Sequence, residues 1–78
     1  MLSLEDYFEY RPPTTEARKL AHDAVNKKAL EFAQVVHTLV DDEDCRKMAI
    51  FAIQQARMLA NQGVTIDEIK KNRRQSAP

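Results

Sequence analysis

The chain has 78 residues, and its 12 Lys and Arg side chains are balanced by 12 Asp and Glu side chains. Zero net charge disfavours a generic polyanion binder held by counterion release. A single cysteine excludes an intramolecular disulfide framework. No apolar run reaches the 18 or so residues of a membrane span, and no secretory signal pattern opens the chain, so we expect a soluble, cytosolic protein without a membrane partner.

The first half of the chain predicts a short helix followed by a long one. Ser3 and Asp6 have capping-box spacing, which predicts a helical turn over residues 4–8. Arg11-Pro12-Pro13 ends this turn, because each proline keeps its predecessor out of the α region. Thr14 or Thr15 then caps a helix of about residues 15–40, in which apolar residues recur every three or four positions.

The second half predicts another long helix and a tail. The acidic cluster 41–44 suits a helix N-terminus, so a second helix should begin at about Asp44, and Gly63 suits the position just past its end. Thr65 to Glu68 has capping-box spacing and predicts a further short helix. We therefore expect an all-α protein, with one helical-hairpin domain over residues 1–68 and a disordered basic tail over residues 69–78.

Residues 48–53 of the second long helix are apolar on nearly every side. One partner helix can cover only one stripe of such a helix, and Phe51 and Met58 share a flank that the first helix is unable to cover alone. A chain of this length buries only about 60% of its unfolded surface. Together these features predict a homo-oligomer, because an exposed patch of this kind on a monomer promotes aggregation.

Aromatic residues gather just before the prolines. Tyr7, Phe8 and Tyr10 lie within four residues and are followed by Arg11 and Pro12. Nucleic acid bases stack on aromatic rings, and phosphates pair with arginine and with helix N-termini. The alternative is a hydrophobic staple, in which the aromatic rings only pack the short helix onto the hairpin.

Asn26 and Lys27 lie on the polar face of the first long helix. They can contact a phosphate, or they can simply form a solvated face. No nucleophile system, acid–base pair or metal-ligand spacing accompanies them, since His22 and His37 lie far apart and Cys45 lacks a partner base. We therefore expect no enzyme, no metal and no cofactor.

Two stretches resemble the second anti-CBASS protein family of bacteriophages. Residues 4–13 read LEDYFEYRPP, similar to the family's opening F-x-Y-H/R-P-P, and residues 45–61 resemble its segment S-R-E…A…L-E-E-A-x-x-W-A-N. The likeness covers about residues 4–64. Cys45 stands in place of a serine, Leu59 in place of a tryptophan, and Asn26 at the position of the family's helix cation, with Lys27 the nearest cation.

This resemblance implies a phage protein that sequesters cyclic oligonucleotide signals of bacterial CBASS immunity in the host cytoplasm, without degrading them. It also implies a homohexamer of helical hairpins, with cyclic dinucleotides bound between paired subunits; cyclic trinucleotides are a further possible ligand. The residues that the resemblance assigns to the ligand are Phe8, Tyr10, Arg11, Pro12, Asn26 and Lys27, with Tyr10 stacking on a base.

A rival hypothesis is a small DNA-binding regulator. Leu59 to Asn72, with Gly63 between two helices, weakly resembles a helix-turn-helix. Asp67 and Glu68 at the base-reading end would repel the DNA backbone, so genomic nucleic acid is not expected as a partner. A structural helical adaptor is the third alternative.

Overall fold

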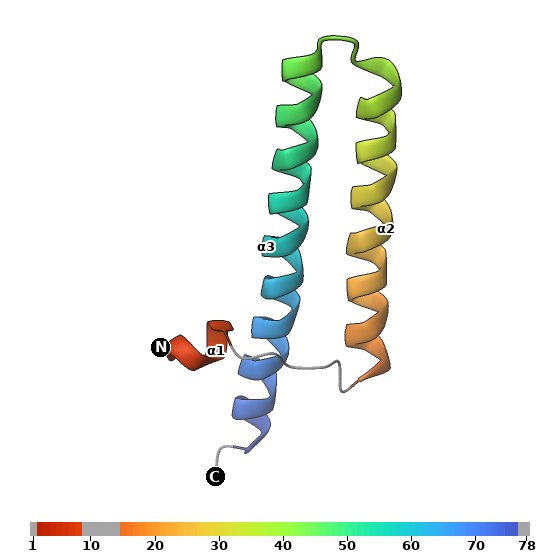
Figure 1. The fold of residues 1–78 in the computed structure, drawn as a ribbon. Coiled ribbons are helices and arrows are strands. Elements are labelled where there is room, and N and C mark those ends of the chain that lie inside the picture. The colour runs from red at the N-terminus through yellow and green to blue at the C-terminus, as the bar shows by residue number, and fades with distance from the viewer. Residues whose placement is uncertain (1, 9–14, 77–78) are drawn as a thin grey trace.

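The computed structural model describes residues 2–8 and 15–76, which form three helices. These are α1 (Leu4–Phe8), α2 (Glu16–Leu39) and α3 (Glu43–Ser76). Helices α2 and α3 form an antiparallel hairpin, and α1 lies beside the C-terminal half of α3 (Figure 1). The described residues contain no strand. The predicted all-α class, a short helix followed by a two-helix hairpin, is confirmed.

The helix starts follow the predicted caps. The backbone N–H of Asp6 donates to Ser3 Oγ at 3.3 Å, and the backbone N–H of Ser3 donates to Asp6 Oδ2 at 2.9 Å, which completes a capping box. Thr15 Oγ1 accepts from the backbone N–H of Arg18 at 3.1 Å and so caps α2. Local sequence therefore determines where α1 and α2 begin.

The acidic cluster caps α3. Asp42 Oδ2 accepts from the backbone N–H of Cys45 at 2.8 Å, and this hydrogen bond lowers the pKa of the Asp42 carboxyl. Across the turn, Arg46 Nη1 donates to the carbonyl oxygen of Val40 at 3.4 Å. Helix α3 begins at Glu43, one residue before the predicted start.

The predicted helix end at Gly63 is wrong, because α3 continues without interruption through this residue. Gly63 does not adopt a positive φ. Thr65, the predicted cap of a separate helix, instead donates its hydroxyl to the carbonyl oxygen of Asn61 at 3.2 Å and accepts from Arg18 Nη2 at 3.1 Å. The contact with α2 thus compensates for the low helix propensity of glycine.

Residues 69–76, where a disordered tail was expected, belong to α3. Ile69 is buried, and Arg73 bonds to α1. These tertiary contacts order a stretch that its polar composition alone would leave unfolded. The division of the chain into a domain of residues 1–68 and a tail stays a prediction.

The hairpin is thin and elongated. Its radius of gyration is 16.0 Å, whereas a compact chain of this length would have about 11–12 Å. Among the described apolar side chains only Val36 and Ile69 are buried. None of the helices formed by the described residues combines the length and the apolar composition that a membrane span requires.

Polar side chains join α2 to α3 near the start of α2. Arg18 is only 7% exposed. Its guanidinium donates to Glu68 Oε1 at 3.3 Å and to Thr65 Oγ1 at 3.1 Å, and its Nε donates to His22 Nε2 at 3.3 Å. A buried guanidinium is tolerated only when its donors are satisfied, so this network determines how the two helices meet.

Replacement of Arg18 by methionine should lower the free energy of unfolding by about 3 kcal/mol, because the nearly buried Glu68 carboxylate would lose its charged partner. Lys28→Ala removes the exposed pair between Lys28 and Glu31 and serves as the matched control, with an expected change below about 0.5 kcal/mol. Urea denaturation followed by circular dichroism measures both. Equal effects of the two substitutions would contradict the assigned role of Arg18.

Substitution of Gly63 by alanine should raise the free energy of unfolding by about 0.5–1 kcal/mol, because alanine has the higher helix propensity. Beyond the neighbouring backbone of α3 itself, a Cβ on Gly63 would meet no atom within 4 Å. Ala60→Gly, one turn earlier on the same helix, should lower the free energy of unfolding by a similar amount. Destabilisation by Gly63→Ala would show that another surface approaches this backbone.

Candidate ligand-binding site

Only part of the predicted ligand site lies within the described residues. Tyr10, Arg11 and Pro12 lie outside them. Phe8 is the last residue of α1 and is 81% exposed, while Asn26 and Lys27 lie in α2. Of these described residues, Asn26 lines an open groove of the hairpin.

An open groove of about 1040 Å³ runs between the first half of α2, the middle of α3 and α1. Its apolar side is formed by Tyr7 of α1 and by Phe51, Met58 and Leu59 of α3. Phe51 is 63% exposed, and the other three are also largely open to solvent. The predicted shared flank of Phe51 and Met58, uncovered by α2, is confirmed.

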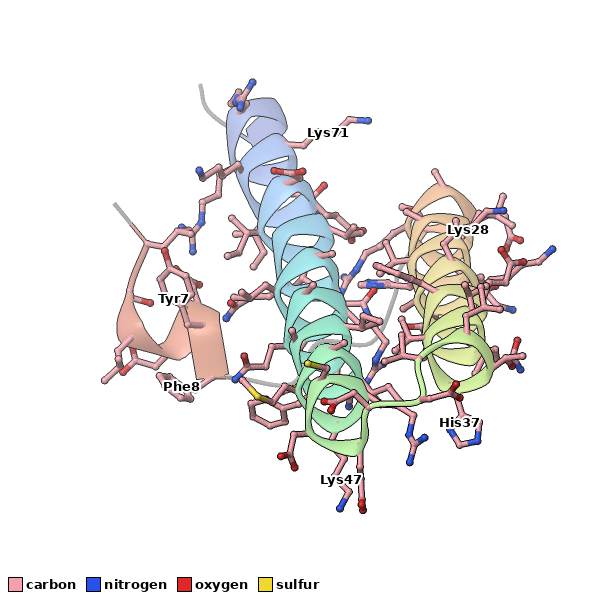
Figure 2. The ribbon with its side chains drawn as sticks, turned by 90° about the horizontal axis from the view of Figure 1, so that it is seen from above. Tyr7, Phe8, Lys28, His37, Lys47 and Lys71 are labelled. Atoms are coloured by element: carbon pink, nitrogen blue, oxygen red, sulfur yellow. The ribbon has the colours of Figure 1, made fainter. Side chains whose placement is uncertain are left out.

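Tyr7 is placed at this groove by the docking of α1. Its carbonyl oxygen accepts from Gln62 Nε2 at 3.5 Å, and its ring lies on the side of α1 that faces α3 (Figure 2). Phe8, in contrast, projects away from the hairpin (Figure 2). The structure thus adds Tyr7, which the predicted set of ligand residues did not include, to the edge of the groove, and Tyr7 also lines a smaller pocket with Lys70 and Arg73.

The polar side of the groove is a chain of hydrogen bonds that crosses between the helices. His22 Nε2 accepts from Arg18, so the ring proton lies on Nδ1, which donates to Asn61 Oδ1 at 2.9 Å. Asn61 Nδ2 donates in turn to Asn26 Oδ1 at 2.9 Å. Each donor in this series of hydrogen bonds faces an acceptor. The series therefore fixes which side-chain atom of Asn26 is the oxygen that accepts from Asn61.

Arg57 of α3 does not line this groove, but it approaches Asn26 from the other side of the hairpin, where it lies beside Ala56 and Ala60. Its Nη1 donates to Asn26 Oδ1 at 3.2 Å, and its Nε donates to Gln54 Oε1 at 3.0 Å. Asn26 Oδ1 therefore accepts two hydrogen bonds, and no described residue accepts one from its Nδ2. The arrangement leaves the amide donors of Asn26 without an acceptor among the described residues.

Sequence reasoning missed Arg57, His22 and Asn61, although a signal was present. Polar residues recur every three or four positions in both helices, namely Arg18, His22 and Asn26 in α2, and Gln54, Arg57, Asn61, Thr65 and Glu68 in α3. Two facing polar stripes of this kind indicate a polar helix interface. Their register, however, depends on how α2 and α3 pair.

Lys27 is not brought to the groove within one chain. It is exposed and follows Asn26 by one residue, so it points about 100° away around the helix. Among the described residues it has no hydrogen bond or ion pair. Its contact with a ligand stays a prediction, and it would require a second subunit.

Within the described ranges, residues 2–8 and 15–76, His, Cys, Asp and Glu side chains form no cluster of three or more that could hold a metal ion. The groove instead combines aromatic and apolar surface with amide side chains, and its charged lining residues include Lys19, Asp23 and the buried Arg18. Such a surface can stack planar rings and donate hydrogen bonds to anionic oxygens.

Comparison with known families gives one informative match. The model described as Acb2/Tad1, hairpin domain, matches residues 3–65. Comparisons with curated proteins and with solved structures gave no significant match. At the level of the family, this match supports an anti-CBASS sponge, a binding domain rather than an enzyme. The match covers most of the chain, including α1, α2 and the first two thirds of α3, and the chain therefore belongs to the Acb2/Tad1 hairpin-domain family.

Proposed function

We propose that this protein sequesters cyclic oligonucleotide second messengers of CBASS immunity during phage infection. The family match supports the sponge role, and the groove beside Asn26 supports the class of ligand. Cyclic dinucleotides are the primary candidates and cyclic trinucleotides a further possibility. The protein acts in the cytoplasm of the host bacterium, where these signals are made.

The bases of the ligand match the apolar side of the groove. Tyr7 and Phe51 both line the groove and are partly exposed, and the predicted Tyr10 follows Tyr7 by three residues. Stacking of one base on an aromatic ring contributes about 1–3 kcal/mol. Two stacked bases and a few charge-assisted contacts are enough for micromolar binding, about −8 kcal/mol.

The phosphates match the polar side. Arg57 and Asn61 hold the carbonyl oxygen of Asn26, so the amide nitrogen of Asn26 is directed outward as a donor. In this chain the Asn26 amide, held by Arg57 from the other side of the hairpin, stands at the position of the helix cation that the resemblance implies. A few placed amide donors, with the exposed Lys19 on the same groove, can recognise a compact dianion on a protein of zero net charge.

Binding without cleavage fits the groove chemistry. Its lining offers mainly amide, apolar and aromatic side chains, with Lys19 and Asp23 as exposed charged residues, whereas hydrolysis of a phosphodiester requires a nucleophile with a base, or a metal ion. His22 donates to Asn61 and accepts from Arg18, so both ring nitrogens are engaged within the protein. The role we propose is therefore capture and not turnover.

The rival DNA-binding hypothesis loses its structural basis. The weak helix-turn-helix required two helices separated at Gly63, and residues 43–76 form one helix. A recognition helix that enters the major groove would need such a turn.

We also propose that the chain acts as a homo-oligomer, with a hexamer as the expected assembly. A packed monomer of 9.0 kDa would have about 4,900 Å² of accessible surface, and this chain has 6356 Å². The excess of about 1,500 Å² corresponds to nearly two standard interfaces at about 800 Å² per partner. Contact with more than one other copy of the chain would bury this excess surface.

A second groove offers a surface for self-association. It has a volume of about 540 Å³ and lies between α2 and α3, lined by Val25, Ala29 and Phe32 and by the small residues Ala49, Ala52, Ala56 and Ala60. Small side chains allow the backbone of another helix to approach closely. Phe32 is 59% exposed at its edge, so it contributes little to the hairpin itself.

Titration calorimetry with 3′,5′-cyclic dinucleotides tests the ligand. Arg57→Ala should weaken binding roughly tenfold, because the Asn26 amide would lose one of the two hydrogen bonds that orient it. Tyr10→Ala should weaken it roughly ten- to a hundredfold, through the loss of one stack. Lys47→Ala is the matched control, since Lys47 pairs with Glu43 in the first turn of α3 and should leave affinity unchanged.

Ligand recovered after denaturation of the complex should be chemically intact. Absence of binding by the wild-type protein to any cyclic di- or trinucleotide would overturn the proposed function. Protein-dependent linearisation of the ligand would overturn the proposal of capture without catalysis.

Self-association is tested by light scattering coupled to gel filtration. The wild-type chain should give a mass several times 9.0 kDa, and Phe32→Glu should lower it, because a carboxylate would be placed in the second groove. Gln34→Glu adds the same charge at another exposed position of α2 and should preserve the assembly. A monomeric wild-type chain at micromolar concentration would disprove the oligomer.

A further inference from the structure

The side of the groove that α2 supplies is polar along its whole length. The α2 residues that line it are Arg18, Lys19, His22, Asp23 and Asn26. Their spacings of three and four place them on one face of the helix, over a length of about 12 Å. The apolar lining, with Phe51 and Met58, comes from α3 on the opposite side. A planar base that lies on the apolar side chains of α3 therefore turns one edge toward the polar face of α2.

Most of the polar side chains on this face are already engaged within the protein. Arg18 is buried and bonded to α3. Both ring nitrogens of His22 and the carbonyl oxygen of Asn26 also have partners. The side chains of Lys19 and Asp23 are exposed, and neither forms a hydrogen bond or an ion pair with the residues that the structure describes. The two charges of this face thus remain available to a ligand.

The carboxylate of Asp23 limits what can lie beside it. An ionised carboxylate is only an acceptor and offers two oxygens. It repels a phosphate, so the part of a nucleotide that faces Asp23 must donate hydrogen bonds. Guanine has two adjacent donors on its Watson–Crick edge, N1–H and the N2 amino group, and these match the two carboxylate oxygens. The same edge of adenine has one donor beside the acceptor N1, whose lone pair would face a carboxylate oxygen.

We propose that Asp23 is a specificity-determining residue that selects a guanine base in the groove. This inference rests on the proposed function and deepens it, because it names guanine-containing cyclic oligonucleotides as the class of ligand. The base stacks on the apolar side chains of α3, and its Watson–Crick edge meets Asp23 across the groove. The phosphates remain at the amide donors and at Lys19, away from the carboxylate.

The expected size of the selection follows from the number of hydrogen bonds. A bidentate pair between a side chain and the correct base discriminates against a wrong base by roughly ten- to a hundredfold. A ligand without the matching donors also leaves the carboxylate unpaired beside it. Because the groove is open and water can replace part of the lost contact, we expect the lower value, about tenfold.

Titration calorimetry with 3′,5′-cyclic di-GMP and 3′,5′-cyclic di-AMP tests this proposal. The wild-type protein should bind cyclic di-GMP about tenfold more tightly than cyclic di-AMP. Asp23→Asn should abolish or reverse this preference, because an amide offers one acceptor and one donor and so pairs with the edge of adenine. Asp67→Asn is the matched control, since it removes an exposed carboxylate of α3 that does not line the groove, and it should leave the preference unchanged.

The outcomes separate this inference from the proposed function. If the wild-type protein binds no cyclic di- or trinucleotide, the proposed function fails and this inference fails with it. Equal binding of the two ligands, or binding of other cyclic nucleotides alone, would keep the proposed function and overturn the selection of guanine. An equal loss for both ligands in Asp23→Asn would also overturn it, because the carboxylate would then meet a group that both share, such as a ribose hydroxyl. Light scattering should give Asp23→Asn the wild-type mass, and a lower mass would assign Asp23 to a contact between subunits instead.

Discussion

The buried guanidinium of Arg18 connects the elements of this protein. It lies at the start of α2 and donates to Thr65 and Glu68 of α3 and to His22 of its own helix. Because a buried charge must have its donors satisfied, the register of the hairpin follows from these three contacts. The same contacts stabilise α3 on the C-terminal side of Gly63. Arg18 is also the first donor in the series of hydrogen bonds that runs through His22 and Asn61 to Asn26.

A hairpin held by polar contacts leaves its apolar side chains for other partners. Only two apolar side chains are buried among the described residues, while several large ones on α2 and α3 remain open. One open face, with Phe51 and Met58, borders the groove beside α1, and the other is the alanine-lined groove. Ligand capture and self-association can thus use different sides of one thin hairpin, and an assembly would supply the core that the single chain lacks.

Much of the fold could be predicted from residues close in sequence. Capping by Ser3 with Asp6, by Thr15 and by Asp42 is local chemistry, and the structure contains all three. Gly63 and the basic residues after it were misinterpreted, because local propensity favours a helix end there. Contacts made by residues about 50 and 67 positions away in sequence overrode that preference.

For the candidate site, the sequence by itself determined the residue types and their order: an aromatic-proline segment, a capped helix carrying Asn26, and the family pattern over most of the chain. Tertiary structure alone decided which side chains meet. Arg57 reaches Asn26 only because α2 and α3 pair antiparallel in one register, and Arg73 reaches Asp6 only because α3 extends past the start of α2. Helix periodicity places a residue on a face, but the partner of that face depends on packing between distant segments.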